Sequence, residues 1–255
     1  MNKVLTLLFV STILLTGVFI HLNKEQKSSQ QYFLQKRQNN HSSFKTYQQG
    51  TYSYFAFERE WPGTVCKINN CQQDYLGDFD GKNFNIHGLW PNGIEDDQCG
   101  YPQNCGHESF SYTELNSNTI NLMRKYWNGL YNSNNVFIQH EWRKHGTCFE
   151  GDQQSYFSTV LELHDRYNPI SALAQSQISP NNDKGYKLKD IKQSLENSFG
   201  GSVIVKCKKI NGVQMLYAID MTISKEYNVI DNPCKKRAIQ NQHCDEEQLI
   251  IIPTY

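Results

Sequence analysis

The most informative stretch of the chain runs from Phe137 to Cys148 and reads Phe-Ile-Gln-His-Glu-Trp-Arg-Lys-His-Gly-Thr-Cys. Two histidines, a glutamate and a lysine fall within the six residues from His140 to His145. On an α-helix, side chains four residues apart lie about 40° from each other in projection. The spacing therefore predicts a helix on which Glu141 contacts His145 and His140 contacts Lys144. These four side chains would form one polar patch, and the glycine that follows them would end the helix.

A second informative stretch lies upstream, from Phe84 to Asn92, and reads Phe-Asn-Ile-His-Gly-Leu-Trp-Pro-Asn. It is an apolar segment that leads to His87 and then to a turn. A lone histidine near apolar residues is more often a structural group than a catalyst. Taken alone, His87 therefore leaves both interpretations open.

Together the two stretches suit the cleavage of RNA without a metal ion. When a ribose 2′-hydroxyl attacks its own phosphodiester, a base must take the hydroxyl proton and an acid must protonate the departing 5′-oxygen. Positive charge must also stabilise the crowded phosphorus centre. Histidines titrate near ambient pH and can serve as base and acid, while Lys144 and a protonated His140 supply positive charge. Glu141 is expected to orient His145 and hold its proton.

A zinc hydrolase is a competing interpretation, because a common zinc-protease motif also begins with His-Glu. That motif needs its second histidine four residues after the first, on the same helix face. Here position 144 is lysine, and His145 lies five residues after His140, about 140° around the helix. An ammonium group in the ligand position would repel a metal ion. A third interpretation, a solvated helix face with an ordinary charge pair, leaves the density of histidines unexplained.

Both stretches resemble the two active-site segments of the ribonuclease T2 family, the acid ribonucleases of secretory and lysosomal or vacuolar compartments. The resemblance spans residues 52–255 and includes Trp61-Pro62-Gly63 before Cys66, Tyr101 to Cys105, Tyr156-Phe157 and Ile251 to Tyr255. It implies an endoribonuclease that takes single-stranded RNA and forms a 2′,3′-cyclic phosphate, later hydrolysed to a 3′-phosphate. It implies no cofactor and no metal.

The resemblance also implies a role for each matching residue. His87 corresponds to the general acid of the family, and His145 to the base that activates the 2′-hydroxyl. Glu141 and Lys144 correspond to groups that polarise the phosphate and stabilise the transition state. His140 corresponds to a phosphate-binding histidine. A secreted RNA-binding protein without turnover is the alternative on the same fold, and the intact set of these residues counts against it.

Three aromatic residues match positions where the family stacks a base, namely Trp90, Tyr101 and Phe137. Aromatic platforms of this kind suit single-stranded RNA. Core packing is the competing explanation, above all for Phe137.

The sequence departs from the pattern of the family at three positions near these segments. Asn92 stands where many members carry an aspartate that contacts the base, so an amide with donors replaces a carboxylate that only accepts. Ile138 stands where tryptophan is usual. Glu60 stands where glutamine is common and is expected to place negative charge near a second base site.

The eight cysteines form an even set and suit an oxidising compartment. The sequence alone allows 105 pairings. The resemblance implies Cys66–Cys71, Cys105–Cys148 and Cys207–Cys244. Cys99 and Cys234 are left over, and they either bond each other or are misassigned. The alternative is that Cys99 displaces Cys105 as the partner of Cys148.

Composition divides the chain into three parts. Residues 1–21 contain an uncharged apolar stretch, Val4 to Ile20, and are predicted to be a signal peptide or, alternatively, an uncleaved signal anchor. Residues 22–51 are rich in glutamine and asparagine and predict a disordered linker. Residues 52–255 form the predicted catalytic domain. The expected location is the secretory pathway, outside the cell or in a lysosome or vacuole, with no stable membrane association if the signal is cleaved.

The formal net charge is zero at pH 7, which excludes a protein that holds nucleic acid through a long basic surface. Any contact with RNA must then be local. We expect a monomer that binds single-stranded RNA in a short cleft.

Periodicity and punctuation predict an α+β fold with a central antiparallel sheet and helices packed against it. A capping box at Ser111 to Glu114 predicts that the first of these helices begins there. The expected helices cover 115–127, 156–168 and 188–195, the last closed by Gly200-Gly201. The expected strands cover 52–57, 202–207, 215–224 and 248–252.

Overall fold

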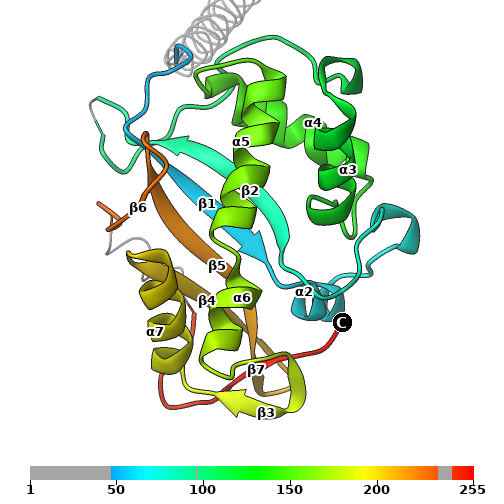
Figure 1. The fold of residues 1–255 in the computed structure, drawn as a ribbon, viewed down its shortest axis with the longest axis vertical. Coiled ribbons are helices and arrows are strands. Elements are labelled where there is room, and N and C mark those ends of the chain that lie inside the picture. The colour runs from blue at the N-terminus through cyan, green and yellow to red at the C-terminus, as the bar shows by residue number, and fades with distance from the viewer. Residues whose placement is uncertain (1–46, 96, 235–242) are drawn as a thin grey trace, which may run out of the picture. The chain divides into compact units, whose positions relative to one another are not determined.

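The computed structural model describes residues 47–95, 97–234 and 243–255, and it confirms the α+β class (Figure 1). The helices are α2 (Pro62–Ile68), α3 (Ser117–Tyr126), α4 (Asn134–Lys144), α5 (Gln153–Arg166), α6 (Pro169–Gln175) and α7 (Leu188–Phe199). The strands are β1 (Tyr54–Glu60), β2 (Asn85–Asn92), β3 (Asn181–Tyr186), β4 (Val203–Ile210), β5 (Val213–Ser224), β6 (Val229–Ile230) and β7 (Ile250–Ile252).

The sheet is built around β5, which is its longest strand. β1 and β4 pair with β5 in antiparallel fashion on its two sides, and β2 pairs with β1 as the next strand outward. The expectation of an antiparallel sheet needs one correction, because β7 runs parallel to β5 where Met215 pairs with Ile251. The antiparallel core of the sheet, β2-β1-β5-β4, is the part that carries the functional side chains.

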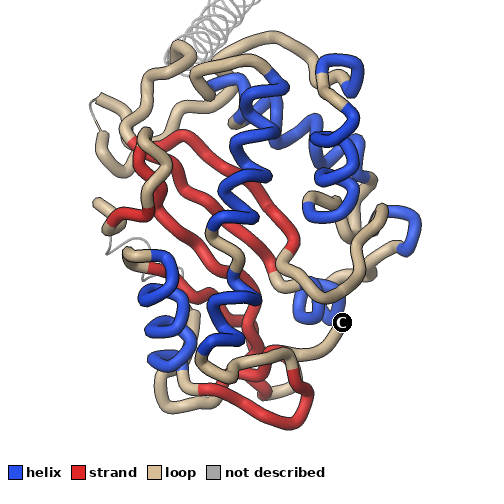
Figure 2. Tube along the Cα trace, viewed as in Figure 1, coloured by secondary structure: helices blue, strands red, loops and turns tan. Residues whose placement is uncertain are grey.

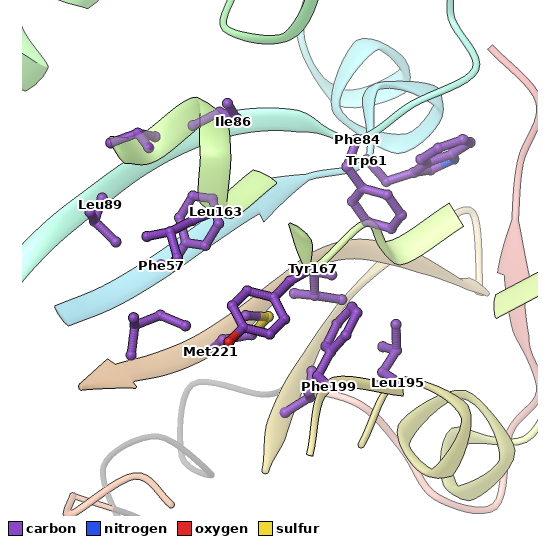
Figure 3. Packing of buried hydrophobic residues seen from close by; sticks show 14 of the residues in the cluster. Phe57, Trp61, Phe84, Ile86, Leu89, Leu163, Tyr167, Leu195, Phe199 and Met221 are labelled. Carbon is purple, nitrogen blue, oxygen red and sulfur yellow. The ribbon is translucent and has the colours of Figure 1, made fainter. Parts of the chain in front are cut away.

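Helices α5, α6 and α7 cover one face of this sheet (Figures 1 and 2). In β1, alternation directs Phe55, Phe57 and Arg59 towards that covered face and leaves Glu58 and Glu60 for the other. Figure 3 shows Phe57 within the apolar cluster beneath the helices, together with Leu163, Tyr167, Phe199 and Met221. One face of the sheet is therefore occupied by the core, and the opposite face is free to carry polar chemistry.

The strand β1 is longer than predicted, since it runs to Glu60 rather than to Phe57. Pro62 does not merely stop the strand, because it is the first residue of α2, where a missing N–H costs nothing. The stretch expected to be a lead-in and a turn around His87 is the regular strand β2. Its Pro91 is tolerated because β2 lies at the edge of the sheet.

The register between β1 and β2 contains a bulge at His87. Glu58 pairs with Gly88 and Arg59 pairs with Ile86, so His87 is the extra residue. Bulges of this kind redirect a side chain and are frequent beside active sites.

The predicted capping box begins a shorter element than expected. The Ser111 side chain accepts a hydrogen bond from the Thr113 N–H and caps the 3₁₀ helix Tyr112–Glu114. The α-helix that follows is α3, and its cap is Asn116, which accepts from Thr119 N–H at 2.8 Å. The two capping residues, Ser111 and Asn116, therefore lie five residues apart, and the sequence pattern identified Ser111 alone.

The two helices around Asn168 also differ from the prediction. The stripe that begins near Tyr156 belongs to α5, which starts three residues earlier and ends two residues earlier than the predicted range 156–168. Pro169 does not only end it, because Asn168 caps a further helix, α6, with proline at its first position. The third predicted helix is confirmed as α7, closed by Gly200 in the left-handed conformation, with φ 77°.

All four disulfides have the predicted partners: Cys66–Cys71, Cys99–Cys234, Cys105–Cys148 and Cys207–Cys244. The alternative partner for Cys148 is therefore wrong.

The predicted signal segment and most of the predicted linker lie outside the described residues. Within the linker range, residues 47–51 are described and belong to the compact unit Tyr47–Tyr255. Gly50 N–H donates to the Cys148 carbonyl at 3.0 Å, and the Gln49 side chain donates to the Gly151 carbonyl at 2.7 Å. Residues 47–51 of the predicted linker range are thus bonded to the segment that follows α4. Within the described residues, no helix has the length and apolar character needed to cross a membrane.

Candidate active site

A cleft of about 720 Å³ brings together all the side chains predicted to act in catalysis or binding. The predicted residues that line it are His87, Trp90, Asn92, Tyr101, Phe137, His140, Glu141, Lys144 and His145. They come from β2, from the loop after it and from α4. The floor of the cleft is the free face of the sheet, where Ala56, Lys206 and Asp220 lie.

Helix α4 presents the predicted polar patch because its apolar side chains anchor the opposite face. Its cap Ser133 accepts from the Val136 N–H, and Ile138 and Trp142, four residues apart, are buried in the core. Ile138, where the family usually has tryptophan, therefore changes the core beneath the helix and not the cleft.

The helix ends at Lys144, and Gly146 allows the tight turn that follows. A Cβ at Gly146 would lie 2.4 Å from the Trp142 ring, so no larger residue fits there.

Glu141 is a buried carboxylate that faces Trp90. Its side chain is 2% exposed, and its Oε2 accepts a hydrogen bond from the Trp90 indole N–H at 2.8 Å. Burial raises the pKa of Glu141, and the charge of His87 and the hydrogen bond from Trp90 oppose that rise. Gly88 makes room for this carboxylate, since a Cβ there would lie 2.3 Å from Oε2.

The expected contact between Glu141 and His145 is absent from the described interactions. His145 is the residue that caps the end of α4, with φ −119° and ψ −48°, so the spacing of an ideal helix does not apply to it. Its imidazole is 6% exposed, and Nδ1 has no hydrogen-bond partner in the described part of the chain. Burial, followed by the charges of Lys144, His140 and His87, lowers the pKa of His145 to about 3. His145 is therefore neutral over most of the pH range and able to accept a proton.

His87 is in the opposite state. Its Nδ1 lies 3.0 Å from Glu58 Oε1 and 3.3 Å from Glu60 Oε1. Burial disfavours the imidazolium, but the hydrogen bonds and charges of the two glutamates outweigh burial and raise the pKa of His87 well above its ordinary value. The bulge places His87 where both carboxylates reach it. One histidine of the cleft thus holds its proton, while the other does not.

Sequence reasoning missed Glu58 and the contact of Glu60 with His87. Glu60 also accepts a hydrogen bond from the Tyr217 hydroxyl at 3.0 Å, and its place near a second base site stays a prediction. Glu58 also pairs with Lys206, which in turn pairs with Asp220 at 2.7 Å. The alternation of β1 could have placed Glu58 and Glu60 on one face, but nothing local in the sequence connects them to His87.

Aromatic rings surround the two histidines. The Trp90 ring lies 5.1 Å from His87, edge-on, and 5.4 Å from His145. Phe137 lies 5.8 Å from His87 and also packs partly against the core, so each of its two predicted roles has support. Tyr101 is 39% exposed at the mouth of the cleft, as is Tyr131, at 40%, which sequence reasoning missed.

Positive charge lies along the exposed edge of α4. His140 is exposed and Lys144 half-buried, and both line the cleft. Partial burial and the charges of Lys144, Arg143 and His87 lower the pKa of His140. An anion placed between these groups would meet at least one fixed positive charge.

Among the described residues, one group of three side chains has the spacing of metal ligands, formed by Glu58, Glu60 and His87. It does not contain His140 or His145, the pair on which the zinc interpretation depended. Lys206 and Tyr217 already occupy hydrogen-bonding positions on its two carboxylates.

Comparison with known proteins agrees with this geometry. The model of the ribonuclease T2 family matches residues 52–243. Ribonuclease Oy from Magallana gigas is 29% identical over 216 residues, covering 79% of this chain and 96% of that protein. Ribonuclease 1 from Arabidopsis thaliana is 34% identical over 183 residues, covering 68% of this chain and 76% of its own length. The crystal structure of RNase NT in complex with 5′-AMP superposes with a TM-score of 0.69 at 31% identity, covering 80% of this chain and 99% of that one.

The match extends over most of the compact unit and includes both active-site segments. The relatives compared above are named ribonucleases. The chain belongs to the ribonuclease T2 family and is an RNA endonuclease.

Proposed function

We propose that the protein cleaves single-stranded RNA by metal-independent transphosphorylation. The single observation that carries this proposal is the pair of unlike histidines in one cleft, His87 held against two glutamates and His145 buried with no hydrogen-bond partner on Nδ1 among the described residues. Neutral His145 takes the proton of the ribose 2′-hydroxyl, whose oxygen attacks the adjacent phosphorus. The bond from phosphorus to the 5′-oxygen breaks, and His87 gives its proton to that oxygen. The products are a 2′,3′-cyclic phosphate and a free 5′-hydroxyl.

Hydrolysis of the cyclic phosphate uses the same groups in reverse. His87 takes a proton from water, the water oxygen attacks phosphorus, and the bond to the 2′-oxygen breaks. His145 then returns a proton to that oxygen, which leaves a 3′-phosphate. DNA lacks the 2′-hydroxyl and should remain intact.

The transition state carries extra negative charge on the phosphoryl oxygens. Lys144 and His140 stand on the side of the cleft where these oxygens would lie, and the buried Glu141 would polarise the phosphate. Trp90, Tyr101 and Phe137 would stack bases, with Asn92 beside them. Asn92 donates its side-chain N–H to the Trp90 carbonyl at 3.0 Å, so its amide oxygen remains for a base donor.

The test is cleavage of a single-stranded RNA oligonucleotide by the purified protein, with the DNA of the same sequence as control. We expect RNA cleavage that persists in chelator, with a cyclic phosphate detected by mass spectrometry before the 3′-phosphate. His87→Ala and His145→Ala should each lower kcat by several orders of magnitude. His107→Ala is the matched control, because His107 is an exposed histidine outside the cleft, and should cleave normally.

Two results would refute the proposal. If the RNA stays intact while the protein is folded, the protein is a binding protein without turnover. If cleavage is lost in chelator, the reaction depends on a metal ion.

The four disulfides and the predicted signal support a location in the secretory pathway. Sequencing the N-terminus of protein recovered from the medium or from an acidic organelle would test this. A mature chain that begins after about residue 21 would support a cleaved signal, and one that begins at residue 1 in a membrane fraction would support an anchor.

A further inference from the structure

Behind the proposed general acid lies a buried carboxylate that has no part in the mechanism above. Glu58 is 6% exposed and stands between two cations. Its Oε1 contacts Nδ1 of His87 at 3.0 Å, and its Oε2 contacts the ammonium group of Lys206. Removing a carboxylate from water is costly unless cations and hydrogen bonds compensate. Here both oxygens have a charged partner.

Three strands build this arrangement. Glu58 on β1 is directly opposite Asp220 on β5, so two carboxylates stand side by side. Lys206 on β4 reaches across to both of them. Two carboxylates this close do not both ionise easily. Burial and the charge of Glu58 raise the pKa of Asp220, whereas the contacts with His87 and Lys206 lower the pKa of Glu58 despite burial. The negative charge therefore resides on Glu58.

The other groups that face His87 either disfavour its protonation or have a weak effect on it. From α4 and its end come Lys144, whose fixed positive charge disfavours an imidazolium, and His140 and His145, whose own pKa values are lowered by burial and by the charge of Lys144. Glu141 on the same helix is a carboxylate whose pKa burial raises.

The groups that favour protonation of His87 lie on the sheet. Glu60 reaches Nδ1 at 3.3 Å, but it is shared with the hydroxyl of Tyr217. Glu58 makes the shorter contact, and it is the one held from behind by a lysine.

We propose that Glu58, fixed by Lys206, is a positioning residue for His87, which orients Nε2 towards the scissile phosphate and keeps His87 a proton donor at neutral and mildly alkaline pH. The Nδ1–H group of His87 donates a hydrogen bond to Glu58. Nε2, on the opposite side of the imidazole ring, is then left to face the cleft. When Nε2 gives its proton to the departing 5′-oxygen, the imidazole that remains is the tautomer with its proton on Nδ1, still bonded to Glu58. This proposal rests on the proposed function.

The first test is the pH profile of kcat/KM for Glu58→Gln, which keeps the size of the side chain and removes its charge. An adjacent charge typically shifts a pKa by 1 to 3 units. We expect the alkaline limb to move down by at least about one pH unit, so that activity at pH 8 falls about tenfold while activity at pH 5 stays within about twofold. Glu150→Gln removes the same formal charge from an exposed site outside the cleft and should leave the profile unchanged.

Asp220→Asn tests which carboxylate carries the charge. Because Asp220 is expected to be protonated, this variant should leave the alkaline limb where it is. A downward shift in Asp220→Asn equal to that in Glu58→Gln would contradict the assignment to Glu58.

The second test does not depend on turnover. The imidazole Hε1 resonance of His87, assigned by its loss in His87→Ala, is followed by NMR against pH in the wild type and in Glu58→Gln. We expect a titration midpoint above the ordinary value of a histidine in the wild type and at least about one unit lower in the variant. Equal midpoints in two proteins with the same melting temperature would overturn the proposal, even if RNA is cleaved. If the wild type does not cleave RNA but the midpoints differ, the proposed function fails while the coupling of Glu58 to His87 stands.

Discussion

At the residue scale, the two histidines set the pH range of activity. His145 must be neutral to act as base, so activity is lost as the pH falls through its pKa of about 3. His87 must be protonated to act as acid, so activity is lost as the pH rises through its raised pKa. The active combination is therefore populated across a wide interval that includes neutral pH.

We predict that kcat/KM falls on the acid side only below about pH 4, because His145 stays neutral above that value. The measurement is initial cleavage of a short RNA between pH 3 and 9, with melting curves at each pH to separate titration from unfolding. Lys144→Gln removes a charge that lowers the pKa of His145, so the acid limb of this variant should lie at higher pH. An acid limb centred near 6.5 in the wild type would show that burial does not act on His145.

A second residue-scale prediction concerns Trp90. In Trp90→Phe the ring remains, but the buried Glu141 loses its hydrogen-bond donor. Leaving a buried acceptor without a partner costs about 1 to 3 kcal/mol, so both the free energy of unfolding and kcat/KM should fall, the latter about tenfold.

Trp142→Phe is the matched control for Trp90→Phe, because the indole N–H of Trp142 donates to the Glu108 carbonyl and not to Glu141. It should lose stability to a similar extent and keep kcat/KM within about threefold. Equal losses of activity in the two variants would show that the Trp90 to Glu141 bond has no catalytic role.

The sequence allowed the polar and aromatic cleft residues on β2 and α4 to be predicted, because each stretch is continuous and carries its own pattern. Glu58, Lys206 and Asp220 could not be predicted, because each is an ordinary charged residue on a different strand. Glu58 and Lys206 are 148 positions apart, and their contact depends on the register of three strands. Local patterns do not specify register between distant strands.

At the element scale, prolines were ambiguous in the sequence, because a proline can either follow the end of one element or begin a helix. Pro62 follows the predicted strand 52–57 and Pro169 follows the predicted helix 156–168, but each is the first residue of a further helix. The rigid φ of proline suits both positions, and only tertiary packing decides between them. The helices with a long apolar stripe, α5 and α7, were predicted correctly because burial of the stripe determines them.

The end of α4 depends on one disulfide, and this gives an element-scale prediction. Cys105–Cys148 closes a separation of 43 residues and holds the turn that follows His145. Chain entropy assigns about 4 kcal/mol to a loop of that length and about 2 kcal/mol to a loop of five or six residues. The double variant Cys105→Ser, Cys148→Ser should therefore lose more stability in urea than Cys66→Ser, Cys71→Ser, whose cysteines are five residues apart.

The first of these double variants should also lose activity at temperatures where it remains folded, since His145 is no longer held. If the two double variants behave alike in both assays, the bond at Cys148 does not position the site.

At the scale of the whole molecule, a buried histidine far from the chemistry affects stability. His164 on α5 lies against Tyr126, and its Nδ1 has no hydrogen-bond partner among the described residues. Burial and the charge of Arg59 lower the pKa of His164 to about 3. The unfolded chain binds a proton there near pH 6.5, and the folded chain does not. Stability is therefore lost as the pH falls from about 6.5 towards 3.

We predict that the free energy of unfolding in urea falls between pH 7 and pH 4.5 by about 1.4 kcal/mol per pH unit for each such histidine. His164→Phe, which keeps an aromatic ring at the site, should flatten this dependence relative to the wild type. His107→Phe, at an exposed position, should not. A wild-type protein equally stable at the two pH values would contradict the prediction.

The zero net charge is consistent with the short cleft observed here. Among the described residues of the cleft, the unpaired positive charge is that of Lys144 on the edge of α4, whereas His87 and Lys206 are paired with carboxylates. A substrate that contacts the protein over only a few nucleotides needs no further positive charge.

The bond between Cys99 and Cys234 joins residues 135 positions apart. If a protease cuts the chain once, anywhere between these two cysteines, the two fragments remain joined by the disulfide. Such nicked protein would show its full mass on a non-reducing gel and two bands only after reduction. A preparation can therefore look intact while it is cut, and its integrity should be judged after the disulfides are reduced.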